Sequence, residues 1–390
     1  MKQVYLQPGN KLVYEIEFED PYSERVKVIR IDKEDEGEFW NKVPASQVDK
    51  PSKELCFRNY IPPQVSIDTP DNIFCKTQTY LFGCQIDRNK LQKNSKYCYK
   101  IYNAAEDQAN PLFCLELLPD MLPKVRLNYG VCAFKIDGKD KILLIGGNIS
   151  NFRNYGSYRS HLYSDCLLYH VDDGYFEEDD FDLSLSSPKD CTTALVLDDK
   201  YVYSFFGRTL KITNEDDFLR SNSKYYEYCK NIERWEINSQ GGDFTNLKIK
   251  FDEKVEKILK PLVIPQDNNS FLIVGGVRGN QTPCSQVCAL KIDQQAFSED
   301  EIDDDNSSNE KDRIDAVISP LVIQEIGAAQ ATQGNEEPTP IKLNVPLSFT
   351  SNSLIQKDGY VSAIGFNASG RAWCFKGDLE KNKFISKCLL

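Results

Sequence analysis

The stretch Lys139-Asp140-Lys141-Ile142-Leu143-Leu144-Ile145-Gly146-Gly147 decides the fold, because a short apolar run ends abruptly at glycine. An apolar run of this length, bounded by turn residues, is typical of a buried strand. A second apolar run, 130–136, precedes it across Asp137-Gly138, which predicts a hairpin. The combination recurs along the chain, and such self-similarity indicates a repeat architecture. The five runs that end in glycine are 80–83, 142–147, 201–207, 271–276 and 360–365.

Each glycine-ended run is flanked by further strands. An apolar partner precedes most of them across a polar turn, a third apolar strand follows after a loop, and an amphipathic fourth strand usually comes next. Four antiparallel strands per unit is one blade of a β-propeller. We therefore predict an all-β chain with a single β-propeller of four-stranded antiparallel blades. The predicted third strands are 98–102, 166–171, 232–237, 287–292 and 372–375.

Six blades are expected, with five and seven left open. Residues 12–18 and 26–31 read as strands without a glycine-ended centre, and we assign them to an atypical sixth blade. Segment 298–345 is acidic and poor in aromatic residues, so we expect it to be an insertion. The expected blades are 1–55, 64–118, 125–185, 188–250, 258–297 and 345–390.

The pattern resembles the kelch repeat, in which an apolar strand ends in Gly-Gly and an aromatic pair follows in the third and fourth strands. The glycine-ended runs lie 60 to 89 residues apart, against about 50 for kelch, so long inserted loops are implied. The resemblance implies a module that holds other proteins. The matching positions are Gly146-Gly147 with Tyr169 and Phe176, and Gly275-Gly276 with Leu290 and Phe297.

Composition limits the class of partner and compartment. The formal charge of −12 argues against non-specific binding of nucleic acid or an anionic membrane by the molecule as a whole. No apolar run approaches the roughly 20 residues that cross a bilayer. The 13 cysteines are an odd, scattered set, and the start of the sequence lacks the apolar core of a signal peptide. We expect free thiols in the cytoplasm or in a cytoskeletal compartment.

The residue inventory does not favour catalysis. His161 and His170 lie in one predicted blade, whereas a two-histidine copper site, as in the kelch-fold enzyme galactose oxidase, needs ligands from distant blades. Cys284 and Cys288 lack a second pair with metal-ligand spacing, so packing between strands is the favoured interpretation. We therefore expect no enzyme activity, no metal and no cofactor. The glycines are expected to be structural: Gly83, Gly146, Gly147, Gly207, Gly275, Gly276 and Gly365.

The distribution of surface charge predicts which face of the propeller binds a partner. In a four-stranded meander, all loops between strands two and three emerge on the same face of the disc. Each of these five loops carries more basic than acidic residues, while residues 172–180 on the opposite face hold six acids and no base. Aromatic and arginine residues favour interface centres. The candidate partner-binding residues are Arg88, Arg153, Tyr155, Tyr158, Arg159, Arg278 and Arg371.

The sequence thus favours a non-catalytic scaffold for protein–protein interaction. We expect a kelch-like architectural or cytoskeleton-associated subunit of a larger assembly that docks an acidic partner on its basic loop face. Two alternatives stay open: a propeller-fold enzyme, which a stoichiometric metal would indicate, and a nucleic-acid-binding subunit, which steep salt dependence would indicate.

Overall fold

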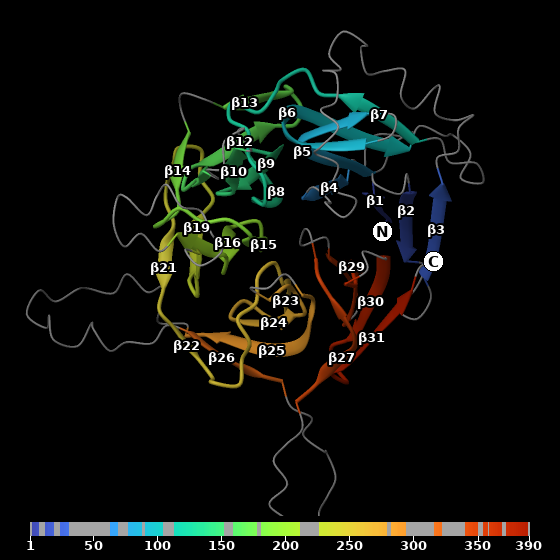
Figure 1. Ribbon diagram of the computed structural model, residues 1–390, viewed down its shortest axis with the longest axis vertical. Helices are drawn as coiled ribbons and strands as arrows, with labels where there is room; N and C mark the ends of the chain where they lie inside the picture. The colour runs from blue at the N-terminus through green and yellow to red at the C-terminus, as the bar shows by residue number, and fades with distance from the viewer. Residues whose placement is uncertain are drawn as a thin grey trace, which may run out of the picture.

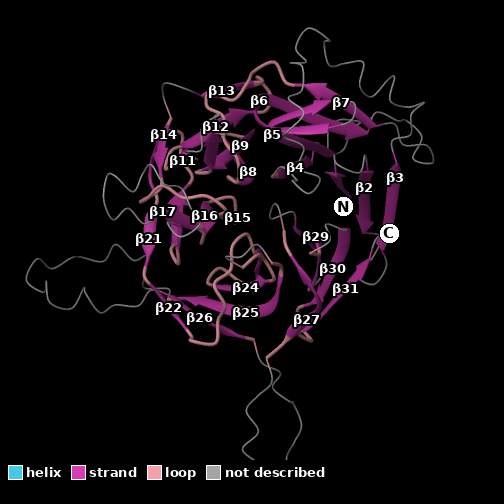
Figure 2. Ribbon diagram, viewed as in Figure 1, coloured by secondary structure: helices cyan, strands magenta, loops and turns pink. Residues whose placement is uncertain are grey.

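Five four-stranded antiparallel meanders form a ring around a central axis in the computed structural model (Figure 1). Every regular element of the described residues is a β-strand, as Figure 2 shows. None of the described residues forms a helix long and apolar enough to cross a membrane. The structure describes residues 2–7, 12–18, 24–30, 63–68, 77–87, 90–103, 113–151, 159–177, 181–210, 226–278, 282–293, 316–321, 340–349, 354–357, 359–368 and 372–388.

The strands of each blade follow in chain order from the axis outward (Figure 1). Blade 1 is β4 (Gln64–Asp68), β5 (Thr77–Asp87), β6 (Lys90–Asn103) and β7 (Phe113–Leu117); blade 2 is β8 (Gly130–Ile136), β9 (Lys139–Ile145), β12 (Cys166–His170) and β13 (Tyr175–Glu177); blade 3 is β15 (Thr193–Leu197), β16 (Tyr201–Phe205), β19 (Ile232–Glu236) and β21 (Thr245–Leu247); blade 4 is β23 (Leu262–Pro265), β24 (Ser270–Val274), β25 (Cys284–Ile292) and β26 (Ala316–Pro320); blade 5 is β28 (Leu354–Lys357), β29 (Tyr360–Phe366), β30 (Ala372–Asp378) and β31 (Lys383–Cys388).

The glycine-ended runs form the second strands of the blades, and these are the most buried. Residues 142–145 of β9 and 271–274 of β24 have no exposed surface. Both faces of a blade pack against neighbouring blades, so these strands read as continuous apolar runs rather than alternating ones. Between blades 1 and 2, the Phe82 ring lies 5.4 Å from that of Tyr169 and 5.7 Å from that of Phe176. The two aromatic residues that carry the kelch resemblance thus pack together at a blade interface.

The N-terminal segment forms a separate three-stranded sheet of β1 (Lys2–Gln7), β2 (Leu12–Phe18) and β3 (Glu24–Arg30). It lies between blades 1 and 5 in Figure 1, and β1 contacts β4 and β5. The structure therefore corrects the expected count from six to five four-stranded blades, the lower number that the sequence left open. The described part of segment 1–55 supplies only three strands, with no glycine-ended second strand to build a blade around.

Hairpins extend the loops between the second and third strands of blades 2 and 3. In blade 2, β10 (Asn148–Asn151) pairs with β11 (Arg159–Leu162). In blade 3, β17 (Arg208–Leu210) pairs with β18 (Tyr226–Tyr228). In blade 1, β5 and β6 run on past a register shift after Phe82 and pair as far as Asp87 and Lys90. Three consecutive blades therefore carry a hairpin at the same position.

Short parallel pairs join neighbouring blades at the outer rim. After blade 2, β14 (Asp182–Ser184) pairs in parallel with β20 (Gly241–Asp243), which leads into the outermost strand of blade 3. After blade 3, β22 (Ile249–Phe251) pairs in parallel with β26 of blade 4. Strand β26 lies inside segment 298–345, so part of the expected acidic insertion completes blade 4. The connector after blade 3 thus covers the exposed edge of blade 4, whereas the connector after blade 2 pairs with the segment just before the outermost strand of blade 3.

Side chains make the same link at the two remaining junctions. The Asp120 carboxylate, on the connector after blade 1, accepts a hydrogen bond of 2.8 Å from the Phe176 amide of blade 2. Strand β27 (Lys342–Leu347) follows blade 4, and its Asn344 bonds both backbone groups of Ser386 in blade 5, at 2.9 and 3.1 Å. At all four junctions between consecutive blades, the connector therefore forms hydrogen bonds with the outer part of the next blade.

Each connector then turns toward the axis and passes close to glycine. A Cβ on Gly275 would lie 2.7 Å from the Leu347 carbonyl oxygen, and one on Gly276 would lie 2.7 Å from that of Leu259. Both residues have positive φ, 58° and 100°, which disfavours any side chain. Among the glycines expected to be structural, φ is positive at Gly83, Gly146, Gly147, Gly207, Gly275 and Gly276, while a Cβ on Gly365 would lie 3.0 Å from the Phe349 ring.

The stability losses of Gly276→Ala and Gly242→Ala can be compared to separate the cost of steric crowding from the cost of backbone strain. Gly242 has a similar φ of 114°, but a Cβ added there would have no other atom within 4 Å, so its substitution carries the backbone strain alone. We expect Gly242→Ala to lower the free energy of unfolding by about 1–2 kcal/mol and Gly276→Ala to lower it by at least about 2 kcal/mol more. Urea denaturation followed by tryptophan fluorescence measures both, and equal losses would contradict the crowding argument.

Candidate interaction face

One face of the ring carries both the long hairpins and the blade connectors; we call it the loop face. In a meander, the chain enters the first strand and leaves the second on the same side. Backbone bridges confirm this, because Leu127 of a connector pairs with Asn148 of β10, and Asp190 of the next connector pairs with Arg208 of β17. The hairpins of blades 2 and 3 therefore rise from bases that the connectors hold.

The structure places two of the predicted partner-binding residues. Arg159 is the first residue of β11, and its backbone pairs with Asn151 of β10. Arg278 follows the glycine pair of blade 4, and its guanidinium forms a two-pronged ion pair with the Glu256 carboxylate, with an Nη2–Oε1 distance of 3.1 Å. The other predicted residues lie outside the described residues: Arg88, Arg153, Tyr155, Tyr158 and Arg371.

Arg278 is held firmly by its own blade. Besides Glu256, its Nη1 donates to the Pro283 carbonyl oxygen at 3.0 Å. This hydrogen-bonded pairing holds the pKa of the Glu256 carboxyl below its usual value. Both side chains remain 39% exposed. Arg278 can therefore meet a partner only in a fixed position, with its charge largely balanced by Glu256.

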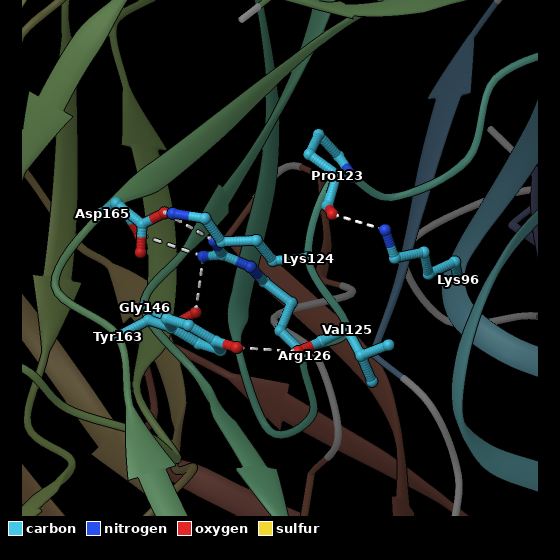
Figure 3. A network of polar contacts seen from close by, with 8 residues as sticks. All are labelled: Lys96, Pro123, Lys124, Val125, Arg126, Gly146, Tyr163 and Asp165. Carbon is cyan, nitrogen blue, oxygen red and sulfur yellow. Dashed lines mark hydrogen bonds and ion pairs between the residues drawn. The ribbon is translucent and has the colours of Figure 1, made fainter.

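A network around Arg126 forms the floor of the loop face between blades 1 and 2 (Figure 3). The Arg126 side chain is completely buried, and Nη1 donates to the carbonyl oxygens of Gly146 and Asp165 at 2.9 and 3.0 Å. Its Nη2 lies 3.0 Å from Asp165 Oδ2, and the guanidinium stacks 4.7 Å from the Tyr163 ring centre. Arg126 thus joins the connector before blade 2 to the blade itself.

Two lysines border this network and reach solvent. Lys96 Nζ, from blade 1, donates to the Pro123 carbonyl oxygen at 2.7 Å, and Lys124 Nζ lies 3.4 Å from Asp165 Oδ2 (Figure 3). The Lys124 side chain is 60% exposed. Lys96 and Lys124 thus place two ammonium groups at the solvent side of the network, while Arg126 is buried and paired with Asp165. Lys96 belongs to the predicted basic loop, whereas Lys124 and Arg126 have no sequence signal that distinguishes them from surface residues.

The next junction buries a second set of charges. Lys189 and Glu233 are both fully buried, with 2.7 Å between Nζ and Oε2. Glu233 Oε1 also accepts hydrogen bonds from the backbone amide and the hydroxyl of Ser186. The adjacent Asp190 is fully buried and accepts from Arg208 Nε and Nη2 at 2.7 and 2.8 Å. These pairs fix the connector between blades 2 and 3 beneath the hairpin of blade 3.

Lys189→Met should lower the free energy of unfolding by about 3–5 kcal/mol, because it leaves the Glu233 carboxylate buried without its counter-charge. The double variant Lys189→Met/Glu233→Gln should lose clearly less. It imitates blade 4, where Gln286 Oε1 accepts from the Glu256 amide at 2.8 Å. Urea denaturation of the two single variants and the double variant measures the coupling, and additive losses would show that the charges do not interact.

The two histidines lie apart within blade 2. His161 is in the β10–β11 hairpin on the loop face, whereas His170 ends β12 toward the opposite face. Lys141 Nζ is 2.5 Å from His170 Nδ1, and Glu177 Oε2 is 3.3 Å from His170 Nε2. Among the described residues, no three His, Cys, Asp or Glu side chains lie together as a metal would require. Cys284 and Cys288 are fully buried, and burial raises the pKa of the Cys288 thiol to about 12.

His170 should make folding stability sensitive to pH. Burial, followed by the charge of Lys141, lowers its pKa below the usual value of about 6.5. Between 6.5 and that lowered pKa, the unfolded chain binds a proton that the folded chain does not, so stability falls as pH falls. We expect His170→Gln to reduce the drop in unfolding temperature between pH 7.5 and 5. An unchanged drop in calorimetry would contradict this assignment.

Comparison with known proteins adds little beyond these observations. No family model matches the chain, and no curated protein matches it. Among solved structures, YjhT matches with a TM-score of 0.43 and 12% identity, over 84% of this chain and 97% of that chain. A chain from the structure of RAG in complex with one melted and one unmelted RSS matches with a TM-score of 0.42 and 14% identity, over 74% of this chain and 80% of that chain.

Proposed function

We propose that this propeller is a non-catalytic scaffold that docks an acidic partner protein on its loop face. The observation that carries the proposal is the set of three hairpins on consecutive blades, with the exposed lysines Lys96 and Lys124 on the same face. The predicted residues Arg153, Tyr155, Tyr158 and Arg159 belong to the hairpin segment of blade 2. A basic surface with aromatic residues suits an acidic protein segment.

The finer identity that we propose is a kelch-like subunit of a larger assembly, architectural or cytoskeleton-associated. Support comes from the glycine-ended second strands and from the packing of Tyr169 on Phe176, with ring centres 5.0 Å apart. The contacts at the four junctions between consecutive blades support a holding role, because they fix the bases of the loops relative to one another. The proposed cytoplasmic or cytoskeletal location rests on the scattered cysteines and the composition alone.

Charge reversal on the loop face should remove partner binding. Arg153→Glu/Arg159→Glu changes the net charge by −4, and its matched control is Lys135→Glu/Lys139→Glu, with the same change on the opposite face. The control lysines are 56% and 60% exposed, and their ion pairs with described residues are long, at 3.5 and 3.9 Å. Affinity capture from the native cell with quantitative mass spectrometry should recover the same partner with wild type and control, and at least about tenfold less with the loop-face variant.

Equal recovery by both variants would show that the partner does not use the loop face. Loss of binding in both would indicate dependence on overall charge rather than on this surface. Circular dichroism and unfolding temperature establish that each variant is folded, so that a binding defect can be attributed to the surface.

A further inference from the structure

Two exposed apolar side chains lie close together at the outer edge of blade 2. Met121, on the connector after blade 1, is 49% exposed, and Tyr175, the first residue of β13, is 40% exposed. The Asp120 carboxylate accepts hydrogen bonds from the Met121 amide at 2.9 Å and from the Phe176 amide at 2.8 Å. Because one carboxylate joins the two segments, the Cα atoms of Met121 and Tyr175 are at most roughly 12 Å apart.

The same connector packs against the turn that leads into β13. A Cβ added to Gly174 would lie 2.8 Å from Cγ of Pro119, so the Pro119 ring lies directly against this turn. Pro119 is itself exposed. Pro119, Met121 and Tyr175 therefore expose apolar surface along one stretch of the blade edge, which we call the rim patch.

Acidic residues adjoin the rim patch. Segment 172–180 holds six acids and no base, and Asp172 and Asp173 are exposed in the turn just before β13. Asp172 forms no ion pair with another described residue, and the ion pair that Asp173 forms with Lys139 is long, at 3.9 Å. These two carboxylates are therefore available to cations from outside the chain.

His170 joins the aromatic and the acidic parts of this surface. The Tyr175 ring stacks on the His170 ring with centres 4.4 Å apart, and Glu177 Oε2 lies 3.3 Å from His170 Nε2. Burial, followed by the charge of Lys141, lowers the pKa of His170, so its ring is uncharged at neutral pH. The imidazole therefore supports the Tyr175 ring without neutralising the Glu177 carboxylate.

We propose that the rim patch docks a basic protein segment in which arginine or lysine flanks an apolar residue. The apolar side chain contacts Pro119, Met121 and Tyr175, while the flanking cations meet Asp172 and Asp173. Charge complementarity selects this occupant, because the carboxylates would repel an acidic segment, and an exposed tyrosine ring also attracts arginine. The rim patch differs from the loop face in position and in sign of charge, so the two surfaces suit different partners.

The test uses the full chain and two fluorescent arginine-rich peptides that differ only at their centre, Leu-Phe in one and Ser-Ser in the other. Fluorescence anisotropy should show that wild type binds the Leu-Phe peptide at least about tenfold more tightly than the Ser-Ser peptide. Met121→Ser/Tyr175→Ser should remove this preference. Val317→Ser/Ile385→Ser is the matched control, since it changes the other two exposed large apolar side chains of the described residues, and it should keep the preference.

A second pair of variants tests the charges and remains informative if the apolar double variant does not fold, which circular dichroism establishes. Asp172→Asn/Asp173→Asn should weaken binding of the Leu-Phe peptide by about tenfold or more. Its control, Asp198→Asn/Asp199→Asn, changes two exposed acids in a turn of blade 3 and should leave this affinity unchanged.

Three results would overturn the proposal: no binding of the Leu-Phe peptide by wild type, equal affinity of wild type for both peptides, or equal weakening by a variant and its control. The loop-face partner does not enter these measurements, so their failure leaves the loop-face proposal intact.

Discussion

The path of each connector from the outer rim to the axis depends on the absence of side chains at the ends of the second strands. The Lys189 carbonyl oxygen would lie 2.5 Å from a Cβ on Gly146, and the Leu347 carbonyl oxygen 2.7 Å from one on Gly275. The same connector carbonyls accept hydrogen bonds from Gly147 and Gly276 at 2.8 and 2.9 Å. The glycines therefore provide both the space for the connector and the backbone donors that hold it. The packing of the blades and the position of the hairpin bases both follow from this passage.

The connectors meet this constraint with two kinds of side chain. One residue of each connector forms a backbone bridge to the chain that follows the second strand of the next blade. The residue before it is apolar and almost fully buried in blades 4 and 5, where it is Ile258 and Leu347. In blades 2 and 3 the same position holds a cation, Arg126 and Lys189. Apolar residues pack there without need of partners. The two cations require Asp165 and Glu233, since a buried charge without a counter-charge is strongly destabilising. The charged junctions lie beneath the hairpins of blades 2 and 3, so the most polar part of the interior supports the proposed binding surface.

The sequence carries enough information for the blades and too little for their junctions. Glycine-ended apolar runs and turn pairs such as Asp137-Gly138 predict β9 and its hairpin, because local chemistry determines both. The blade count depends on how residues 1–55 pair, which no local pattern contains. Strand β26 contains the apolar residues Ala316, Val317 and Ile318, but they follow a long acidic segment, and only the pairing with β25 assigns them to blade 4. On the loop face, basic loops can be located by the meander rule, but Arg126 and Lys189 look like ordinary surface residues until the fold buries them.

In both parallel pairs at the rim, the strand of the connector comes first in the chain. Strand β14 precedes the outer strand of blade 3 in the chain, and β22 precedes that of blade 4. During synthesis from the N-terminus, β14 and β22 therefore leave the ribosome before the strands with which they pair, β20 and β26. An unpaired outer strand is the part of a sheet protein most prone to join another chain, and in blade 4 the cover of that strand is synthesised first. The order of the elements along the chain thus makes the edge of blade 4 available for pairing within its own chain as soon as it is synthesised.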